Sequence, residues 1–125
     1  MSRITSTAKK APAMKIENSK AQMKKGVLEY CILAIISRKD CYVSEIIHEL
    51  KEAKMIVVEG TLYPLLTRLK NAGLLSYRWE ESRQGPPRKY YTLTETGTKY
   101  LDEMDESWKE LVEAVEWINQ KRTPH

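Results

Sequence analysis

The sequence predicts a mainly α-helical chain that carries one β-hairpin, an α+β fold of one small domain with a long final helix. Three observations support this prediction. Apolar residues recur at helical spacing up to residue 73, alternate with polar residues over 75–93, and return to helical spacing over 94–120. A chain of 125 residues is also long enough for one domain with a hydrophobic core.

Charge is distributed unevenly along the chain. Residues 1–25 hold seven Lys and Arg against one acidic residue, whereas residues 94–120 hold two against eight. Segment 1–14 is rich in Ser, Thr, Ala and Lys, which predicts a disordered basic tail that can still contact phosphates. No apolar run approaches the roughly 20 residues of a membrane span, and the N-terminus lacks a signal-peptide core. We therefore expect a cytoplasmic protein that meets a polyanion on one side.

The residue types that commonly bind metals or act in catalysis are scattered. Cys31 and Cys41 do not form a CxxC pair, and His48 and His125 are not spaced to join them in a zinc site. Glu49 follows His48 with no nucleophile at a recognisable spacing, and the chain has no glycine-rich phosphate loop. We therefore expect no metal, no cofactor and no enzymatic activity.

Helices are expected in the first part of the chain. Residues 15–25 show weak helical periodicity, and residues 26–37 (GVLEYCILAIIS) are apolar nearly all round, which predicts a buried helix. A short extended link is expected over 55–58. Between them, apolar residues at i, i+3, i+4 and i+7 mark one face of an amphipathic helix: Val43, Ile46, Ile47 and Leu50.

Residues 60–75, GTLYPLLTRLKNAGLL, predict another amphipathic helix. Pro64 would cost about 3 kcal/mol in a helix interior but little in the first turn, so we expect the helix to begin near Gly60 or Thr61, with Thr61 as its N-cap. Gly73 is expected to end it. The leucines form the buried face, and the remaining side chains are available to a partner: Thr61, Tyr63, Pro64, Thr67, Arg68, Lys70 and Asn71.

A hairpin is expected next. LLSYRWEE alternates, with Leu75, Tyr77 and Trp79 on one side, and we expect Trp79 in the core. SRQGPP is a turn by composition, and RKYYTL over 88–93 is the second strand. The tip of this hairpin would present three cations: Arg83, Arg88 and Lys89.

From Thr94 to residue 120 the chain is expected to be helical, with a short tail over 121–125. Apolar residues spaced alternately by 3 and 4 form a heptad seam: Leu101, Met104, Trp108, Leu111, Val115 and Ile118. A domain this small cannot cover the whole seam. We expect the first turns to pack internally and the rest to form a homodimer interface. Trp108 and Met104 could line an effector pocket there, although at heptad positions such residues are more commonly plain core.

This order of elements is that of a winged helix-turn-helix over residues 15–93. The N-terminal part of its last helix commonly meets base edges in the major groove, and the hairpin, or wing, lies along the DNA backbone or in the minor groove. Taken alone, the helix over 60–73 is more commonly a plain surface helix. Together with the wing and the basic N-terminus, it predicts sequence-specific binding of double-stranded DNA. A protein–protein adaptor that no longer binds DNA is the alternative.

Several blocks of this sequence resemble the PadR family of bacterial transcriptional regulators. They are GTLYPLLTRLKNAGLL, RWEE and GPPRKYYTLTETG, while EYCILAII and YVSEIIHEL are similar to the first two helices of that family. The resemblance covers residues 24–120, and a single C-terminal helix is typical of the short branch of the family. The basic tail before Lys15 departs from the pattern, which leaves its role open.

The resemblance implies a homodimer that is held by the C-terminal helix, represses transcription from pseudo-palindromic operators and responds to small aromatic or drug-like compounds. It also implies roles for individual residues. Thr61, Tyr63, Pro64 and Arg68 would lie on the DNA-facing helix, and Arg83, Arg88 and Lys89 on the wing. Trp108 would lie in the dimerisation helix, where some relatives stack a ligand.

Overall fold

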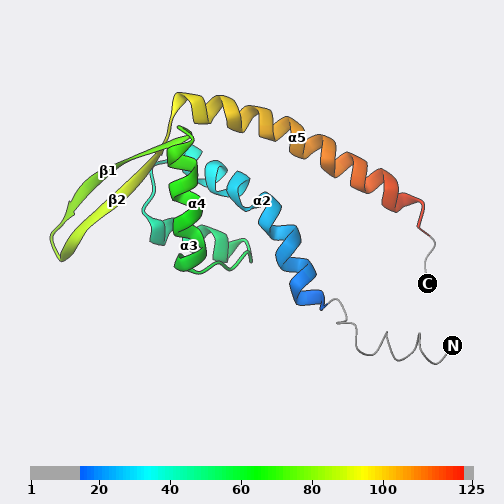
Figure 1. The fold of residues 1–125 in the computed structure, drawn as a ribbon, viewed down its shortest axis with the longest axis horizontal. Helices are drawn as coiled ribbons and strands as arrows, with labels where there is room; N and C mark the ends of the chain where they lie inside the picture. Colours follow the sequence, from blue (N-terminus) through cyan, green and yellow to red (C-terminus); the bar gives the residue numbers. More distant parts are fainter. Residues whose placement is uncertain (1–14, 123–125) are drawn as a thin grey trace.

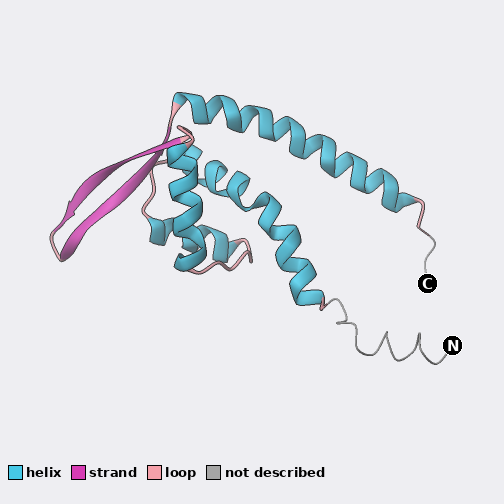
Figure 2. Ribbon diagram, viewed as in Figure 1, coloured by secondary structure: helices cyan, strands magenta, loops and turns pink. Residues whose placement is uncertain are grey.

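The computed structural model describes residues 15–122, which form four helices and one two-stranded antiparallel sheet (Figure 1). The predicted basic tail, 1–14, and residues 123–125 lie outside the described residues. The α+β class and the winged helix-turn-helix are confirmed (Figure 2). The elements in chain order are α2 (Ile16–Arg38), α3 (Val43–Glu52), α4 (Glu59–Asn71), β1 (Leu75–Ser82), β2 (Gly85–Leu93) and α5 (Glu95–Gln120).

The hydrophobic core lies where the C-terminal half of α2 meets α3, α4 and the base of the hairpin. The hairpin projects from this core on one side, while the N-terminal half of α2 and the C-terminal half of α5 project on the other (Figure 1). The core is therefore confined to the middle of the molecule. Its most fully buried side chains are Ile32, Leu33, Ile36, Cys41, Ile46, Leu50, Leu62 and Leu66.

α2 is one continuous helix, and the prediction of two helices divided at Gly26 was wrong. Gly26 lies in the helix interior, and a Cβ built there would meet nothing within 4 Å. A glycine in such a position costs about 1 kcal/mol relative to alanine but keeps its N–H and C=O for the helical ladder. The buried second half of α2 supplies the packing that stabilises the helix.

α4 begins at Glu59, earlier than predicted, and its capping residue is Val58 without a side-chain hydrogen bond. Thr61 is therefore not the N-cap. Pro64 lies inside the helix and not in its first turn. Its ring nitrogen cannot donate to the carbonyl of Gly60 four residues earlier. Since Gly60 is exposed, water can reach that carbonyl.

α3 and α4 both end with a residue in the left-handed region. This residue is Gly73 after α4, as predicted, with φ of 81°, and Lys54 after α3, with φ of 63°. The two ends have the same paired hydrogen bonds, which satisfy carbonyls of the last turn. In each pair, the bond that spans more residues joins the amide of Leu74 to the carbonyl of Leu69 at 3.0 Å after α4, and the amide of Met55 to the carbonyl of Leu50 at 2.8 Å after α3.

The turn of the hairpin is shorter than predicted. It holds only Arg83 and Gln84, and the expected turn residues Pro86 and Pro87 belong to β2. They lie in the stretch where the register between the strands shifts. Because a β-bulge leaves residues unpaired, the missing N–H groups of two prolines are tolerated there.

The loop between α2 and α3 forms an isolated antiparallel β-bridge with the wing. The amide of Cys41 donates to the carbonyl of Tyr91 at 3.1 Å, and the amide of Tyr91 donates back at 2.8 Å. Both side chains are buried. The base of the wing is thus tied directly to the start of α3.

A cluster of hydrogen bonds, called here the Thr94 junction, joins α4, the wing and α5. The Thr94 hydroxyl donates to the carbonyls of Gly73 at 2.6 Å and Leu74 at 3.1 Å. The same oxygen accepts the amide hydrogen of Gly97 at 2.9 Å, which caps α5. The chain that leaves α4 and the first turn of α5 are therefore held together at one side chain.

Only the first turns of α5 pack on the core. Leu101 is buried and Met104 is half-buried. Tyr30 of α2 donates to the Asp105 carboxylate at 2.6 Å, and its ring lies 6.2 Å from that of Trp108. The later turns of α5 leave large apolar side chains 48–63% exposed: Leu111, Val115, Trp117 and Ile118.

No helix of residues 15–122 is long and apolar enough to cross a membrane.

Candidate nucleic-acid interface

The residues predicted on the partner-facing side of α4 point in three directions. A helix turns by about 100° per residue, so the surface opposite the leucines is wide. One part faces α2, a second faces outward and a third faces the wing. The α2 side holds Thr61 and Arg68, and the outward part holds the exposed Pro64. The wing side holds Tyr63, Thr67 and Lys70.

Arg68 is turned toward α2. Its guanidinium donates two hydrogen bonds to the Glu29 carboxylate, at 2.7 and 2.6 Å. This contact raises the pKa of Arg68. Because the Arg68 side chain is 73% exposed, solvent weakens the ion pair. The structure therefore places Arg68 as a link between α4 and α2, away from the cations of the wing.

A groove runs between α4 and the wing, and we call it the α4–wing groove. Near the start of α4 it is a recess of about 400 Å³. A smaller recess of about 210 Å³ follows toward the end of α4, and Lys89 lines both. The groove is lined from α4 by Glu59, Tyr63, Thr67, Lys70 and Asn71, from the wing by Tyr77, Trp79, Pro87, Arg88, Lys89 and Tyr91, and at one end by Tyr42, Val43 and Ser44.

Two lysines of the groove lie over aromatic rings. The Lys89 ammonium is 4.4 Å from the ring centroid of Tyr77 and 5.4 Å from that of Trp79. The Lys70 ammonium is 5.7 Å from the centroid of Tyr77. Such contacts stabilise by about 0.5–1 kcal/mol at exposed sites. Within residues 15–122 neither lysine forms an ion pair, so both charges are available to an anion.

Trp79 was predicted in the core, but it is 61% exposed in the groove. The alternation of the strand placed it correctly on the side of Leu75 and Tyr77. That side is buried at Leu75, at the base of the wing, and open at Trp79, because the wing extends beyond the core. Sequence reasoning therefore missed Trp79 and Tyr77 as groove residues. The length of the strand relative to so small a domain was the available signal.

The three predicted wing cations do not lie together. Arg83 is exposed in the turn, at the far end of the hairpin. Arg88 and Lys89 are neighbours in β2, and successive side chains of a strand point to opposite faces. Lys89 faces Tyr77, whereas the Arg88 guanidinium lies 5.0 Å from the ring centroid of Tyr42.

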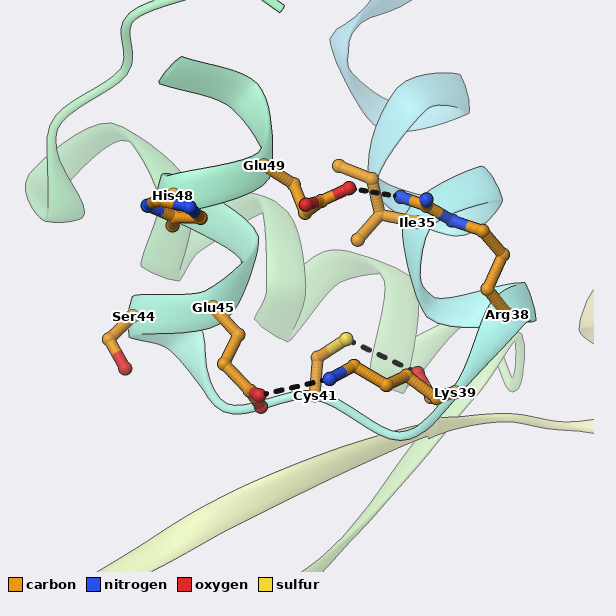
Figure 3. A pocket seen from close by; sticks show the side chains of 8 residues that line it. All are labelled: Ile35, Arg38, Lys39, Cys41, Ser44, Glu45, His48 and Glu49. Atoms are coloured by element: carbon orange, nitrogen blue, oxygen red, sulfur yellow. Dashed lines mark hydrogen bonds and ion pairs between the residues drawn. The ribbon is translucent and has the colours of Figure 1, made fainter. Parts of the chain in front are cut away.

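A hollow of about 350 Å³ lies between the end of α2 and α3 (Figure 3). Its four charges form two ion pairs, Arg38 with Glu49 and Lys39 with Glu45. The Cys41 thiol donates to the Lys39 carbonyl at 3.2 Å, and burial raises its pKa, which is the opposite of what activates a nucleophile. In the described part of the chain, no three His, Cys, Asp or Glu residues gather as metal ligands. Ile35, Ser44 and His48 complete the lining.

Known proteins are similar to this chain in both sequence and fold. Residues 32–103 match the sequence model of the transcriptional regulator PadR-like family. The X-ray structure of a PadR-like transcription factor from Bacteroides fragilis is 62% identical, with a TM-score of 0.70, and the match covers 81% of this chain and 98% of that one. A PadR-like transcriptional regulator from Bacillus cereus is 39% identical, with a TM-score of 0.72 and coverage of 81% and 99%.

An uncharacterised protein of Lysinibacillus sphaericus is 32% identical over 95 residues, or 74% of this chain and 87% of its own length. The two solved relatives are named for transcription, and neither is named as an enzyme. The family match spans more than half of the chain and includes α3, α4 and the wing. On this sequence and this fold, the chain belongs to the PadR-like family of transcriptional regulators.

Proposed function

We propose that this regulator is a dimer that binds a pseudo-palindromic DNA operator sequence-specifically, represses transcription in the cytoplasm and is released by a small aromatic or drug-like effector. The observation that carries this proposal is the α4–wing groove. It combines an exposed helix face with two lysines, Lys70 and Lys89, that no carboxylate neutralises in the described residues. Double-stranded DNA offers the matching phosphates and base edges.

The exposed face of α4, from its outward part to the α4–wing groove, is proposed to read bases. Thr67 and Asn71 are exposed and offer hydrogen-bonding groups, while Tyr63 and Pro64 suit apolar contact with a thymine methyl group. Thr61 would meet the DNA at the α2 side of the helix. Arg68 lies there too, and it would contact a phosphate by exchanging the Glu29 carboxylate for it.

The wing is proposed to bind the DNA backbone. Arg83 in the turn, Arg88 on one face and Lys89 on the other are spread along the hairpin, which suits several phosphates and not one. Trp79 adds an exposed aromatic surface beside Lys89. Each phosphate contact contributes to affinity without regard to sequence and weakens as salt is added.

The dimer is proposed to form between α5 of one copy and the N-terminal half of α2 of another. A hollow of about 590 Å³ between that half of α2 and the link before α4 has an apolar lining that includes Leu28, Met55 and Val57. Three lysines border it: Lys20, Lys24 and Lys25. The exposed apolar seam of the acidic α5 matches this hollow in polarity and in charge. The interface residues proposed on α5 are Met104, Trp108, Leu111, Val115 and Ile118. Leu101, which the seam also includes, is buried in the core of its own chain and packs internally.

The effector is proposed to bind at the inner end of this interface. Trp108 is 42% exposed and Met104 is half-buried, so both retain apolar surface that a second copy could enclose. An aromatic compound would stack on the indole of Trp108.

A selection of genome fragments by the purified protein at physiological salt tests the proposed function. We expect one pseudo-palindrome to be enriched and bound roughly 10³-fold more tightly than random DNA. Weak, salt-sensitive binding without enrichment, even with candidate effectors removed, would favour an adaptor that binds proteins through the exposed side of α5.

Two variants separate the proposed roles of α4 and the wing. Tyr63→Ala should reduce affinity for the selected fragment more than affinity for random DNA, because base contacts carry specificity. Arg88→Ala should reduce both and lower the slope of log affinity against log salt by about one. Equal losses for Tyr63→Ala on the two DNAs would exclude base contact by Tyr63.

A further inference from the structure

Tyr42, the residue directly before α3, connects the wing to the helices. Because Cys41 pairs with Tyr91 in antiparallel fashion, Tyr42 lies opposite Tyr90 of β2. The two ring centroids are 4.0 Å apart and the planes are inclined by 50°. This contact lies beyond the backbone bridge, on the way to the tip of the wing.

Two arginines extend this ring pair into a column of four side chains. The Arg88 guanidinium lies 5.0 Å from the Tyr42 centroid, and the Arg78 guanidinium lies 4.8 Å from the Tyr90 centroid. Arg78 pairs with Tyr90 across the strands, and Arg88, two residues before Tyr90, lies on the same face of β2. The order along the column is therefore cation, ring, ring, cation.

The two ends of the column differ in their partners. Arg78 donates to Asp40 at 2.6 Å and to Glu80 at 3.2 Å, so carboxylates hold it. Arg88 forms no ion pair within residues 15–122. A guanidinium that rests on a ring by its flat face keeps its N–H edge free for an oxyanion. Arg88 is thus held in place with its hydrogen-bonding capacity unused.

The wing needs such a support because it projects from the core (Figure 1). A two-stranded hairpin is at best marginally stable by itself, and its outer part can bend and twist. The Tyr42–Tyr90 contact supports β2 from the side of α3, one residue beyond the backbone bridge at Tyr91. Arg88, two residues farther out, lies against the same ring and borders the recess that contains Tyr63 of α4.

We propose that Tyr42 is a positioning residue for DNA binding. Its ring holds Arg88 where the guanidinium can contact a phosphate of the DNA backbone. The proposal rests on the proposed function, since it needs a DNA that the wing contacts. Tyr42 itself touches no phosphate in this arrangement and acts through Arg88. The contact with Arg88 is made by the Tyr42 ring.

A double-mutant cycle on the full chain and its selected DNA fragment tests this. Arg88→Ala is expected to lower affinity about tenfold in the wild-type background and less than about twofold in a Tyr42→Leu background. Tyr42→Leu alone should lower the salt slope by about one, as Arg88→Ala does. Tyr42→Phe should keep wild-type affinity and slope. Arg83→Ala, in the turn, is the matched control and should lower DNA affinity by the same factor in the wild-type and Tyr42→Leu backgrounds.

Equal effects of Arg88→Ala in the two backgrounds would overturn the proposal, as would loss of affinity in Tyr42→Phe. If Tyr42→Leu does not fold, Tyr42→Met removes the same ring with a more flexible apolar side chain and serves in the same cycle. Wild-type protein that binds no fragment would refute the proposed function. A wild-type protein that binds, with additive variants, would refute only the role of Tyr42.

Discussion

Gly97 lies where the first turn of α5 passes over the chain that leaves α4. A Cβ at this position would lie 2.1 Å from the carbonyl oxygen of Leu74 and 2.8 Å from Cδ1 of Leu93. The Leu74 carbonyl cannot retreat without breaking the Thr94 junction. We therefore expect Gly97→Ala to lower the free energy of unfolding by about 3 kcal/mol, as overpacking does in a closed site. Urea unfolding followed by circular dichroism measures it.

Gly26→Ala is the control for this effect. Gly26 is also helical, but a Cβ there meets nothing within 4 Å. Alanine in the interior of a helix should raise the free energy of unfolding by about 0.5–1 kcal/mol. Similar stabilities of the two variants would show that the close approach at Gly97 is relieved in solution.

The ionisation of Tyr30 should make the free energy of unfolding depend on pH in the alkaline range. The hydrogen bond to Asp105, and then burial, raise its pKa from 10.0 to about 12. Because the folded protein holds this proton more tightly, the stabilisation is complete below pH 10 and is lost as pH rises from 10 to 12. Tyr30→Phe should therefore be less stable than wild type at pH 8, and the difference should shrink above pH 10. Thermal melts across this range would contradict the assignment if the difference stayed constant.

Sequence periodicity predicted on which face of a helix or strand a residue lies better than it predicted which residues that side chain contacts. Arg68 was expected among the residues available to DNA, and it is exposed, yet the carboxylate of Glu29 was invisible to an argument from α4 alone. Trp79 was assigned to the right face of its strand. Whether that face is buried depends on how far the core extends along the strand. The alternation of apolar and polar residues assigns the face but does not tell where the core ends.

Among the elements, the ends of α3 and α4 invite a direct comparison. Both have a left-handed residue at the same position, but α3 uses Lys54 where α4 uses Gly73. A side chain in this region costs about 1 kcal/mol. Lys54→Gly should therefore raise the free energy of unfolding by about 0.5–1 kcal/mol, measured by urea titration.

Gly73→Ala makes the reverse change at the matching position. Its Cβ would meet nothing within 4 Å, so only the backbone conformation is penalised. We expect a loss of about 1 kcal/mol. If Lys54→Gly failed to stabilise while Gly73→Ala destabilised, the Lys54 side chain would have to make a compensating contact.

Element types followed from the sequence, and element boundaries followed less well. The leucine pattern of α4 was sufficient to identify a helix, but the rule that proline belongs in a first turn misplaced its start. Likewise, Gly85, Pro86 and Pro87 have the composition of a turn, although a shift in register accommodates them inside β2. In both cases the local cost is tolerated because packing of the whole element outweighs it.

For the whole molecule, the order of elements predicted the winged helix-turn-helix, but the grooves arise from packing between segments distant in sequence. Tyr42 and Tyr90 are one example, and Glu29 and Arg68 are another. The later turns of α5 leave the seam exposed, and the proposed dimer would cover it. The most direct test of the proposed dimer lies at the end of that helix.

Ile118→Asp should convert the proposed dimer to monomers. Ile118 is 63% exposed, so a carboxylate there costs little in the single chain, whereas a dimer would bury it without a partner. Sedimentation velocity at micromolar concentration measures the change. Gln120→Asp places the same charge on the outer side of α5 and should remain dimeric. A dimer that persists in Ile118→Asp would move the interface away from the seam.

The Thr94 junction ties the end of α4 to the first turn of α5, since one side chain is hydrogen-bonded to both. Two copies joined through α5 would then present their α4 helices at a fixed separation. Such a pair would fit only half-sites at the matching separation along the double helix, whose repeat is roughly 34 Å. Inserting about five base pairs between half-sites would place the second half-site on the opposite side of the duplex. The pair would then bind through one half at a time, and inserting a full turn would not restore it.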